Sequence, residues 1–116
     1  MVRSWLPVAA LTLLSCGTAL GHAKLQSSAP AANSLLKAPK SLSLTFNEPV
    51  KLAVLTVSTG GKPVPLSVDR SADAAREVSV ALPALPPGVY QVDWSALSSN
   101  DGHVVRGRFS FTVTAG

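Results

Sequence analysis

The sequence predicts an all-β fold, an antiparallel two-sheet sandwich of about seven short strands. Several segments alternate polar and apolar residues with period two, which is typical of half-buried strands. Nine prolines and eight glycines supply turns between these segments at regular spacing. No segment shows convincing helical periodicity, so helical and mixed folds are excluded.

The first half of the chain contains the weaker signals. Residues 22–28 are extended and end at residues 29–30, because a residue that precedes proline is pushed out of the helical region. Turns on both sides of Leu35–Leu36 predict a small apolar plug under the sheet. Residues 41–46 alternate as a strand, and Asn47-Glu48-Pro49 is expected to break it.

The next strand, residues 50–58, is apolar on both faces and is therefore expected to be central. One face would carry Leu52, Val54 and Thr56, and the other Ala53, Leu55 and Val57. A glycine turn at residues 59–62 predicts that residues 64–68 return as a hairpin partner. Pro63 and Pro65 restrict that partner to a sheet edge.

The second half predicts the core. Residues 69–75 are a loop or a single helical turn, residues 77–82 alternate again, and residues 83–88 form a proline-rich turn. Two strong strands follow, at residues 89–94 and 104–114. Their apolar faces place the aromatic side chains in the core rather than on a binding surface: Tyr90, Trp94, Phe109 and Phe111.

The first 21 residues are typical of an export signal. Arg3 precedes an apolar run, and Ala19-Leu20-Gly21 forms a small-x-small cleavage site. The run is too short to span a bilayer, and no other stretch reaches that length. The predicted organisation is therefore a signal peptide over residues 1–21 and one mature domain over residues 22–116, exported to the periplasm.

An alternative interpretation of the leader is a weak lipobox that ends at Cys16, which would anchor the protein and leave His22 internal. Under the favoured cleavage the mature chain has no cysteine, which excludes disulfides and thiolate chemistry. Its net charge falls from +4 to +3 with the loss of Arg3. The basic residues are scattered rather than clustered, so nucleic acid is not an expected partner.

The two histidines point to a metal site. His103 lies in the polar turn 98–103, and His22 becomes the first residue after cleavage. A terminal histidine can chelate a metal through its α-amine and Nδ1, His103 adds a third nitrogen, and Asp101 adds an oxygen. Cu(II) favours such a tetragonal plane of nitrogen and oxygen donors. Because binding displaces protons, the affinity is expected to fall on acidification.

Two further residues are candidates to orient an imidazole by hydrogen bonds, Glu48 and Ser98. Each of these features also has a plainer interpretation. Asp101-Gly102 is a common turn dipeptide, a lone surface histidine is usually solvated, and Glu48 before Pro49 is equally compatible with a solvated turn. The joint occurrence of the only two histidines at such positions favours the metal site.

The residues also carry a resemblance to a known family. The mature chain resembles the CopC family of periplasmic copper-resistance proteins along its whole length, in these blocks: residues 22–25, 28–31, 44–50 and 87–94, Ser98, Asp101-Gly102-His103, Gly107 and residues 109–113. The resemblance implies a cupredoxin-like or immunoglobulin-like Greek-key sandwich that carries or sequesters Cu(II). It also implies an inner-membrane copper-uptake partner of the CopD type, and a copper site at His22, Asp101 and His103.

The chain departs from the family pattern in two places. Val104 stands where members often have proline, and the only methionine is Met1, so a thioether Cu(I) site has no ligands after cleavage. Two other functions stay open. A terminal histidine with a second histidine is similar to the histidine brace of copper oxidoreductases, although this chain is small and poor in exposed aromatics. The third function is a metal-free adhesive or structural sandwich module.

Overall fold

The structure, a computed structural model, describes residues 23–69 and 72–115, and its regular elements in these ranges are all strands. They are β1 (Leu25–Ala29), β2 (Leu35–Leu36), β3 (Ser41–Thr59), β4 (Lys62–Val64), β5 (Ala75–Ala81), β6 (Gly88–Ser98) and β7 (Val104–Val113). No helix in the described part of the chain is long and apolar enough to cross a membrane. The signal peptide and His22 lie outside the described residues.

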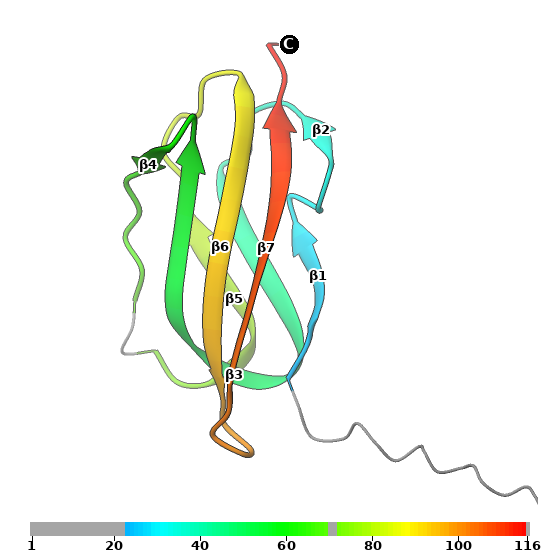
Figure 1. Cartoon of the computed structure of the whole chain (residues 1–116), viewed down its shortest axis with the longest axis vertical. Coiled ribbons are helices and arrows are strands. Elements are labelled where there is room, and N and C mark those ends of the chain that lie inside the picture. The colour runs from blue at the N-terminus through cyan, green and yellow to red at the C-terminus, as the bar shows by residue number, and fades with distance from the viewer. Residues whose placement is uncertain (1–22, 70–71, 116) are drawn as a thin grey trace, which may run out of the picture.

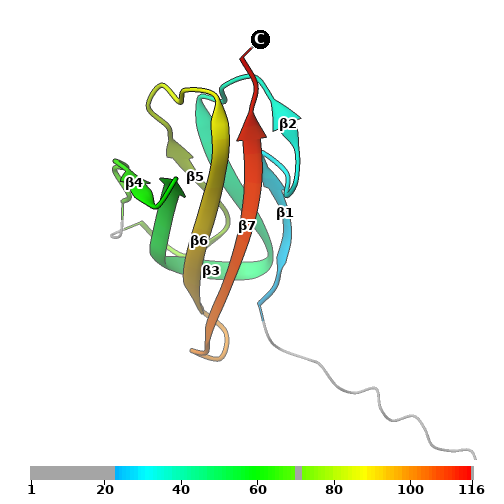
Figure 2. The ribbon, with the colours of Figure 1, turned by 45° about the horizontal axis from the view of Figure 1, so that its top comes forward.

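Strand β3 organises the sandwich because it belongs to both layers. Its first half pairs with β1 and β5, and its second half pairs with β6 and β4. Figures 1 and 2 show the two arms of β3 in different layers, joined by a bend at the lower end of the molecule. One layer is therefore β1–β3–β5, and the other is β4–β3–β6–β7–β2. The predicted all-β, two-layer sandwich is confirmed.

The expected break at residues 47–49 is wrong, because β3 runs through it. The register with β5 shifts between Thr45 and Val50, which marks a bend rather than an end. Pro49 contributes no N–H to the pairing. The Asn47 N–H nevertheless donates to the carbonyl of Lys24, just before β1, so backbone pairing continues into this part of β3. A strand that bends in this way can cross from one sheet to the other.

Three smaller expectations need correction. Leu35 is 72 % exposed, so only Leu36 packs on the core, because neighbours in a strand face opposite ways. Strand β2 pairs with β7 in parallel rather than antiparallel. The hairpin partner of β3 is the short β4, which ends before Pro65. Of the two alternatives for residues 69–75, the described residues 69 and 72–74 show the loop and no helical turn.

The second half of β3 is buried on one face only. Leu55 and Val57 point into the sandwich, and Val54 is 41 % exposed on the outer face. The register with β6 shifts between Leu52 and Val54, so the alternation expected from the sequence is interrupted there. The central position of this strand is confirmed, but its two-sided burial is not.

The aromatic core is confirmed. Tyr90 and Phe111 are each 1 % exposed and stack with their ring centroids 5.6 Å apart. Trp94 meets Phe46 edge to face at 5.2 Å, and Phe109 packs against this cluster. The Trp94–Phe46 contact joins the two layers, whereas the Tyr90–Phe111 stack links β6 and β7 within one layer.

Gly107 of β7 lies directly against the ring of Trp94. A Cβ at this position would lie 2.6 Å from Cζ2 of Trp94. We expect Gly107→Ala to lower the free energy of unfolding by about 1–3 kcal/mol, as overpacking does. Urea unfolding measures this loss, and Trp94→Phe, which removes the crowded ring atoms, should recover part of it. A loss that Trp94→Phe leaves unchanged would contradict the contact.

Candidate metal centre

The turn between β6 and β7 holds His103 and lies at the lower end of the sandwich in Figure 1. Ser98 N–H donates to the His103 carbonyl at 2.9 Å, and Gly102 N–H donates to the Ser98 carbonyl at 2.9 Å. Gly102 has φ +72°, a left-handed conformation that glycine adopts without strain. The turn is therefore closed by its own backbone, with Asp101 and His103 on either side of this glycine.

The structure brings Asp101 and His103 together. Oδ1 of Asp101 accepts a hydrogen bond from the His103 N–H at 3.0 Å, and Oδ2 lies 3.4 Å from Nδ1 of His103. The His103 side chain is 64 % exposed and that of Asp101 is 30 % exposed. An imidazole and a carboxylate thus reach the surface as a pair, which is a donor set that suits Cu(II).

Glu48 and Ser98 also meet, through a hydrogen bond between their side chains. Oε1 of Glu48 accepts from the Ser98 hydroxyl at 2.8 Å and from Nδ2 of Asn100 at 3.0 Å. Ser98 is 1 % exposed, so its hydroxyl depends on this acceptor. Asn100 was not expected at the site, and no sequence signal marks a contact across 52 residues. These bonds hold the turn against the bend of β3.

The entry of the chain into the domain lies at the same end. Lys24 N–H donates to Oδ1 of Asn47 at 2.6 Å, and Asn47 is the neighbour of Glu48. Ala23, the first described residue, is 3 % exposed. In residues 23–69 and 72–115, His, Cys, Asp and Glu side chains form no group of three. The third residue of the predicted copper site, His22, lies outside this range.

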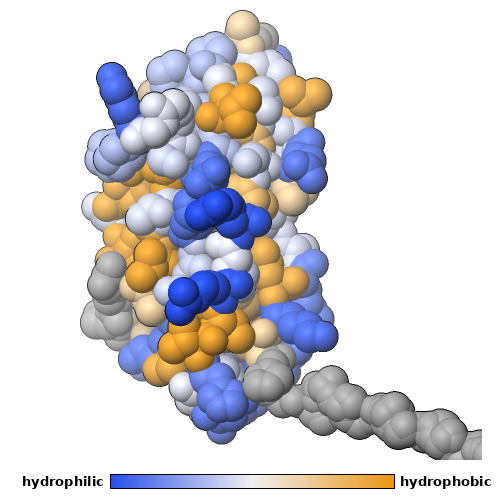
Figure 3. Space-filling model, viewed as in Figure 1, coloured by the Kyte–Doolittle hydropathy of each residue, from blue (hydrophilic) through white to orange (hydrophobic). Residues whose placement is uncertain are grey.

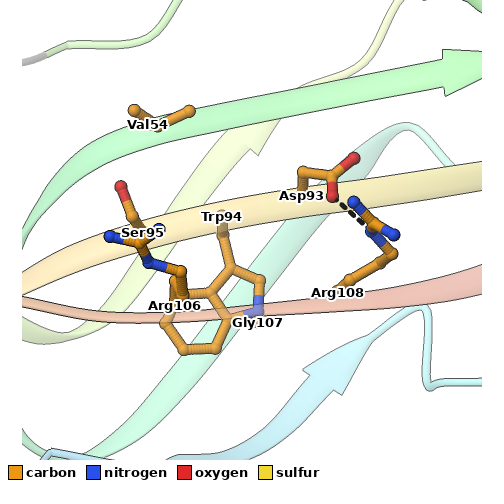
Figure 4. A pocket seen from close by; sticks show the side chains of 7 residues that line it. All are labelled: Val54, Asp93, Trp94, Ser95, Arg106, Gly107 and Arg108. Carbon is orange, nitrogen blue, oxygen red and sulfur yellow. Dashed lines mark hydrogen bonds and ion pairs between the residues drawn. The ribbon is translucent and has the colours of Figure 1, made fainter.

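A second charged pair lies on β6 and β7, away from this turn. Nε of Arg108 donates to Oδ1 of Asp93 at 2.6 Å (Figure 4), and Gln91 donates to Oδ2 at 3.0 Å. These hydrogen bonds, the one from Arg108 first, hold the pKa of Asp93 below its ordinary value of 3.8. A carboxylate so favoured contributes stability above the unfolded pKa and loses it as the pH falls through the folded pKa.

We therefore expect Asp93→Asn to unfold more easily than the wild type at pH 6, by less than about 1 kcal/mol because the pair is open to solvent on the side of Arg108. The difference should shrink as the pH falls through the lowered pKa of Asp93, below which both proteins carry a neutral side chain. Urea unfolding at several pH values checks this. A difference that persists at low pH would show that the pair contributes through packing instead.

Fold and turn together define a class of protein, a small β-sandwich with an exposed histidine–carboxylate pair at the end where its chain enters. The family model of the CopC domain matches residues 25–114. The chain belongs to the CopC family.

Sequence relatives agree with this assignment. Copper resistance protein C of Escherichia coli is 38 % identical over 108 residues, which cover 83 % of this chain and 84 % of that protein. Copper transport protein CutJ of Bacillus subtilis is 31 % identical over 96 % of this chain, which spans only 21 % of CutJ.

Solved structures are similar too. CopC from Methylosinus trichosporium OB3b has a TM-score of 0.68 at 36 % identity and covers 80 % of this chain and 94 % of its own. PcoC, a methionine-rich copper resistance protein from Escherichia coli, has a TM-score of 0.67 at 33 % identity over 81 % of this chain and 100 % of its own. This chain differs from PcoC in holding a single methionine, Met1.

Proposed function

We propose that the mature chain begins at His22 and carries or sequesters Cu(II) in the periplasm for copper resistance and homeostasis. Copper as the ligand follows from membership of a family whose relatives are named for copper resistance and copper transport. The observation that carries the proposal is the pairing of Asp101 with His103 on a turn at the end where the chain enters the domain. The oxidation state, the compartment and the ligand set are our proposals.

In this proposal four donors hold the ion: the α-amine and imidazole of His22, the imidazole of His103 and a carboxylate oxygen of Asp101. Three nitrogens and one oxygen match the preference of Cu(II). Asp101 also offsets part of the positive charge of the ion and, through its bonds to His103, limits the motion of that side chain. The exposure of His103 allows the ion to be handed on.

We propose a carrier rather than an enzyme, with a membrane copper-uptake protein of the CopD type as recipient. Support comes from the names of the relatives, which refer to resistance and transport. CutJ, named a copper transport protein, contains a stretch similar to this chain within a much longer polypeptide. That arrangement supports a function of such a domain in copper transport.

Thermal melting with and without one equivalent of Cu(II) tests the proposal on protein whose N-terminus is confirmed as His22. At a free copper concentration 100 times the Kd, binding adds about 2.7 kcal/mol, which is about 10 °C or more for a domain of this size. A Tm that Cu(II) leaves unchanged would favour the metal-free adhesive module. Peroxide-dependent oxidation of polysaccharide by the copper-loaded protein would favour the histidine-brace oxidoreductase.

Glu48 offers a test of whether the turn must be held in place. We expect Glu48→Ala to weaken Cu(II) binding by about 10- to 100-fold, because the buried Ser98 hydroxyl and Asn100 lose their shared acceptor. Glu48→Gln keeps an acceptor oxygen and should retain most of the affinity. A competition titration with a chelator measures both. Equal losses in the two variants would show that the charge of Glu48 matters and not its hydrogen bonds.

A further inference from the structure

Strand β7 has a free edge over most of its length. One edge pairs with β6 throughout, whereas the other pairs with β2 only at Thr112 and Val113. Ser110 accepts from the N–H of Asn33, and in the described residues no backbone hydrogen bond joins this edge to a neighbouring strand before Ser110. Figures 1 and 2 show β2 beside the C-terminal part of β7 only.

The register identifies which groups face that edge. The His103 carbonyl bonds to β6, whereas the Ser110 carbonyl and the Thr112 N–H bond on the opposite side. Groups that face one edge of a strand come from alternate residues. The N–H and C=O groups of Arg106 and Arg108 therefore point to the free edge and are ready to pair with another strand.

A groove of about 500 Å³ runs along this edge, between β7 and β1. Its lining includes Leu25, Ser27 and Ala31 on the side of β1, and Trp94, Gly107 and Phe109 on the other. Strand β1 belongs to the opposite layer, so a strand added to β7 would lie over β1 and extend the sandwich. Trp94 is 7 % exposed, and its Nε1 has no hydrogen-bond partner in the described part of the chain.

The face beside this edge is positively charged. Arg106 and Arg108 line a second hollow of about 550 Å³ on the outer face of the layer, together with Asp93 and Val54 (Figure 4). Figure 3 shows hydrophilic side chains crossing this face between apolar areas. Arg108 bonds Asp93 through Nε, and no acidic side chain in the described residues forms an ion pair with Arg106.

We propose that the free edge of β7 binds an extended segment of a partner polypeptide that carries carboxylates at alternate positions. Its backbone pairs with Arg106 and Arg108, its carboxylates lie across from their guanidinium groups, and its remaining side chains face the groove. Strand addition of this kind takes affinity from backbone bonds and specificity from alternate side chains. A second copy of this chain would instead set arginine beside arginine, which is unfavourable. The site does not depend on copper.

The probe is an alternating valine–glutamate hexapeptide added to the full mature protein. Trp94 is the one tryptophan beyond the predicted leader, so its emission reports on the groove. We expect a saturable change in emission, and amide exchange slowed about tenfold or more at Arg106 and Arg108. The amides of Val105 and Gly107 face β6 and serve as the internal control. The matched peptide with lysine in place of glutamate should not bind.

Two variants separate backbone pairing from charge. Arg106→Gln should weaken binding about two- to fivefold, as the loss of a cross-strand charge pair does. Arg106→Pro also removes the N–H that faces the edge and should weaken binding about tenfold or more. If the proline variant does not fold, slowed amide exchange at Arg106 and Arg108 of the wild type still tests backbone pairing at this edge.

Three outcomes would overturn the proposal. The first is slowed exchange on another strand, and the second is equal binding of the lysine peptide. The third is protection of Arg106 and Arg108 that grows with protein concentration in the absence of peptide, which would identify a second copy as the occupant. Each of these is independent of Cu(II) titration, so the two proposals fail separately.

Discussion

Replacing His103 with alanine is expected to weaken Cu(II) binding on the order of a hundredfold or more. Removal of a group that only supports a metal ligand costs about 10- to 100-fold, and a ligand should cost at least as much. In free energy this is about 2.7 kcal/mol or more. His103 is the only histidine that the structure describes, and Asp101 holds its ring at the surface. A competition titration with a chelator of known affinity measures the loss.

The matched control is Ser99→Ala in the same turn. The Ser99 hydroxyl bonds to the Pro49 carbonyl at 3.1 Å and is exposed, so its loss should leave the copper affinity within about twofold. Both variants should unfold without copper within about 0.5 kcal/mol of the wild type, because the side chains are on the surface. Equal copper affinity in His103→Ala and the wild type would remove this turn from the site.

Acetylation of the α-amine of His22 is the second change with a large expected effect. It blocks one nitrogen and breaks the chelate that the amine forms with Nδ1, while the imidazole and the rest of the chain stay as they are. We expect a loss on the order of a hundredfold. Selective acetylation is feasible slightly below neutral pH, because the α-amine has a pKa of about 7.7–8.0 against about 10.4 for lysine.

Protein carried through the same treatment without the acetyl donor is the control, and mass spectrometry confirms that the lysines are unmodified. This experiment tests whether the site needs the N-terminus that cleavage after Gly21 would create. If the natural N-terminus were an acylated Cys16, His22 would be internal and a free amine would have no place in the site. Unchanged affinity after acetylation would contradict the proposed ligand set and leave His103 and Asp101 as a weaker pair.

Local pattern was sufficient to predict the sandwich and its core. The alternation that contains Tyr90, Trp94 and Phe111 reports burial directly, since successive side chains of a strand face opposite sides. The bend of β3 was not predictable in this way. Asn47-Glu48-Pro49 has the composition of a turn, and only pairing with Lys24, which is distant in sequence, shows that the strand continues.

In the candidate site, too, contacts between residues close in sequence were predictable and those between distant residues were not. Asp101 and His103 are two residues apart, so the sequence alone places them together, and the structure gives their contact. Glu48 and Ser98, the candidates to orient an imidazole, meet each other and Asn100, and their role toward His103 stays a prediction. Such contacts depend on how the bend of β3 packs against the β6–β7 turn at one end of the sandwich. The roles of His22 and of all four donors stay predictions.

Electron paramagnetic resonance of Cu(II) bound to the mature protein, with its N-terminus confirmed as His22, tests the central claim most directly. One equivalent of copper should give a single tetragonal signal with couplings to several nitrogens, and both His103→Ala and acetylation of the α-amine should abolish it. A weak or heterogeneous signal that survives both changes would contradict a built Cu(II) site and indicate adventitious binding.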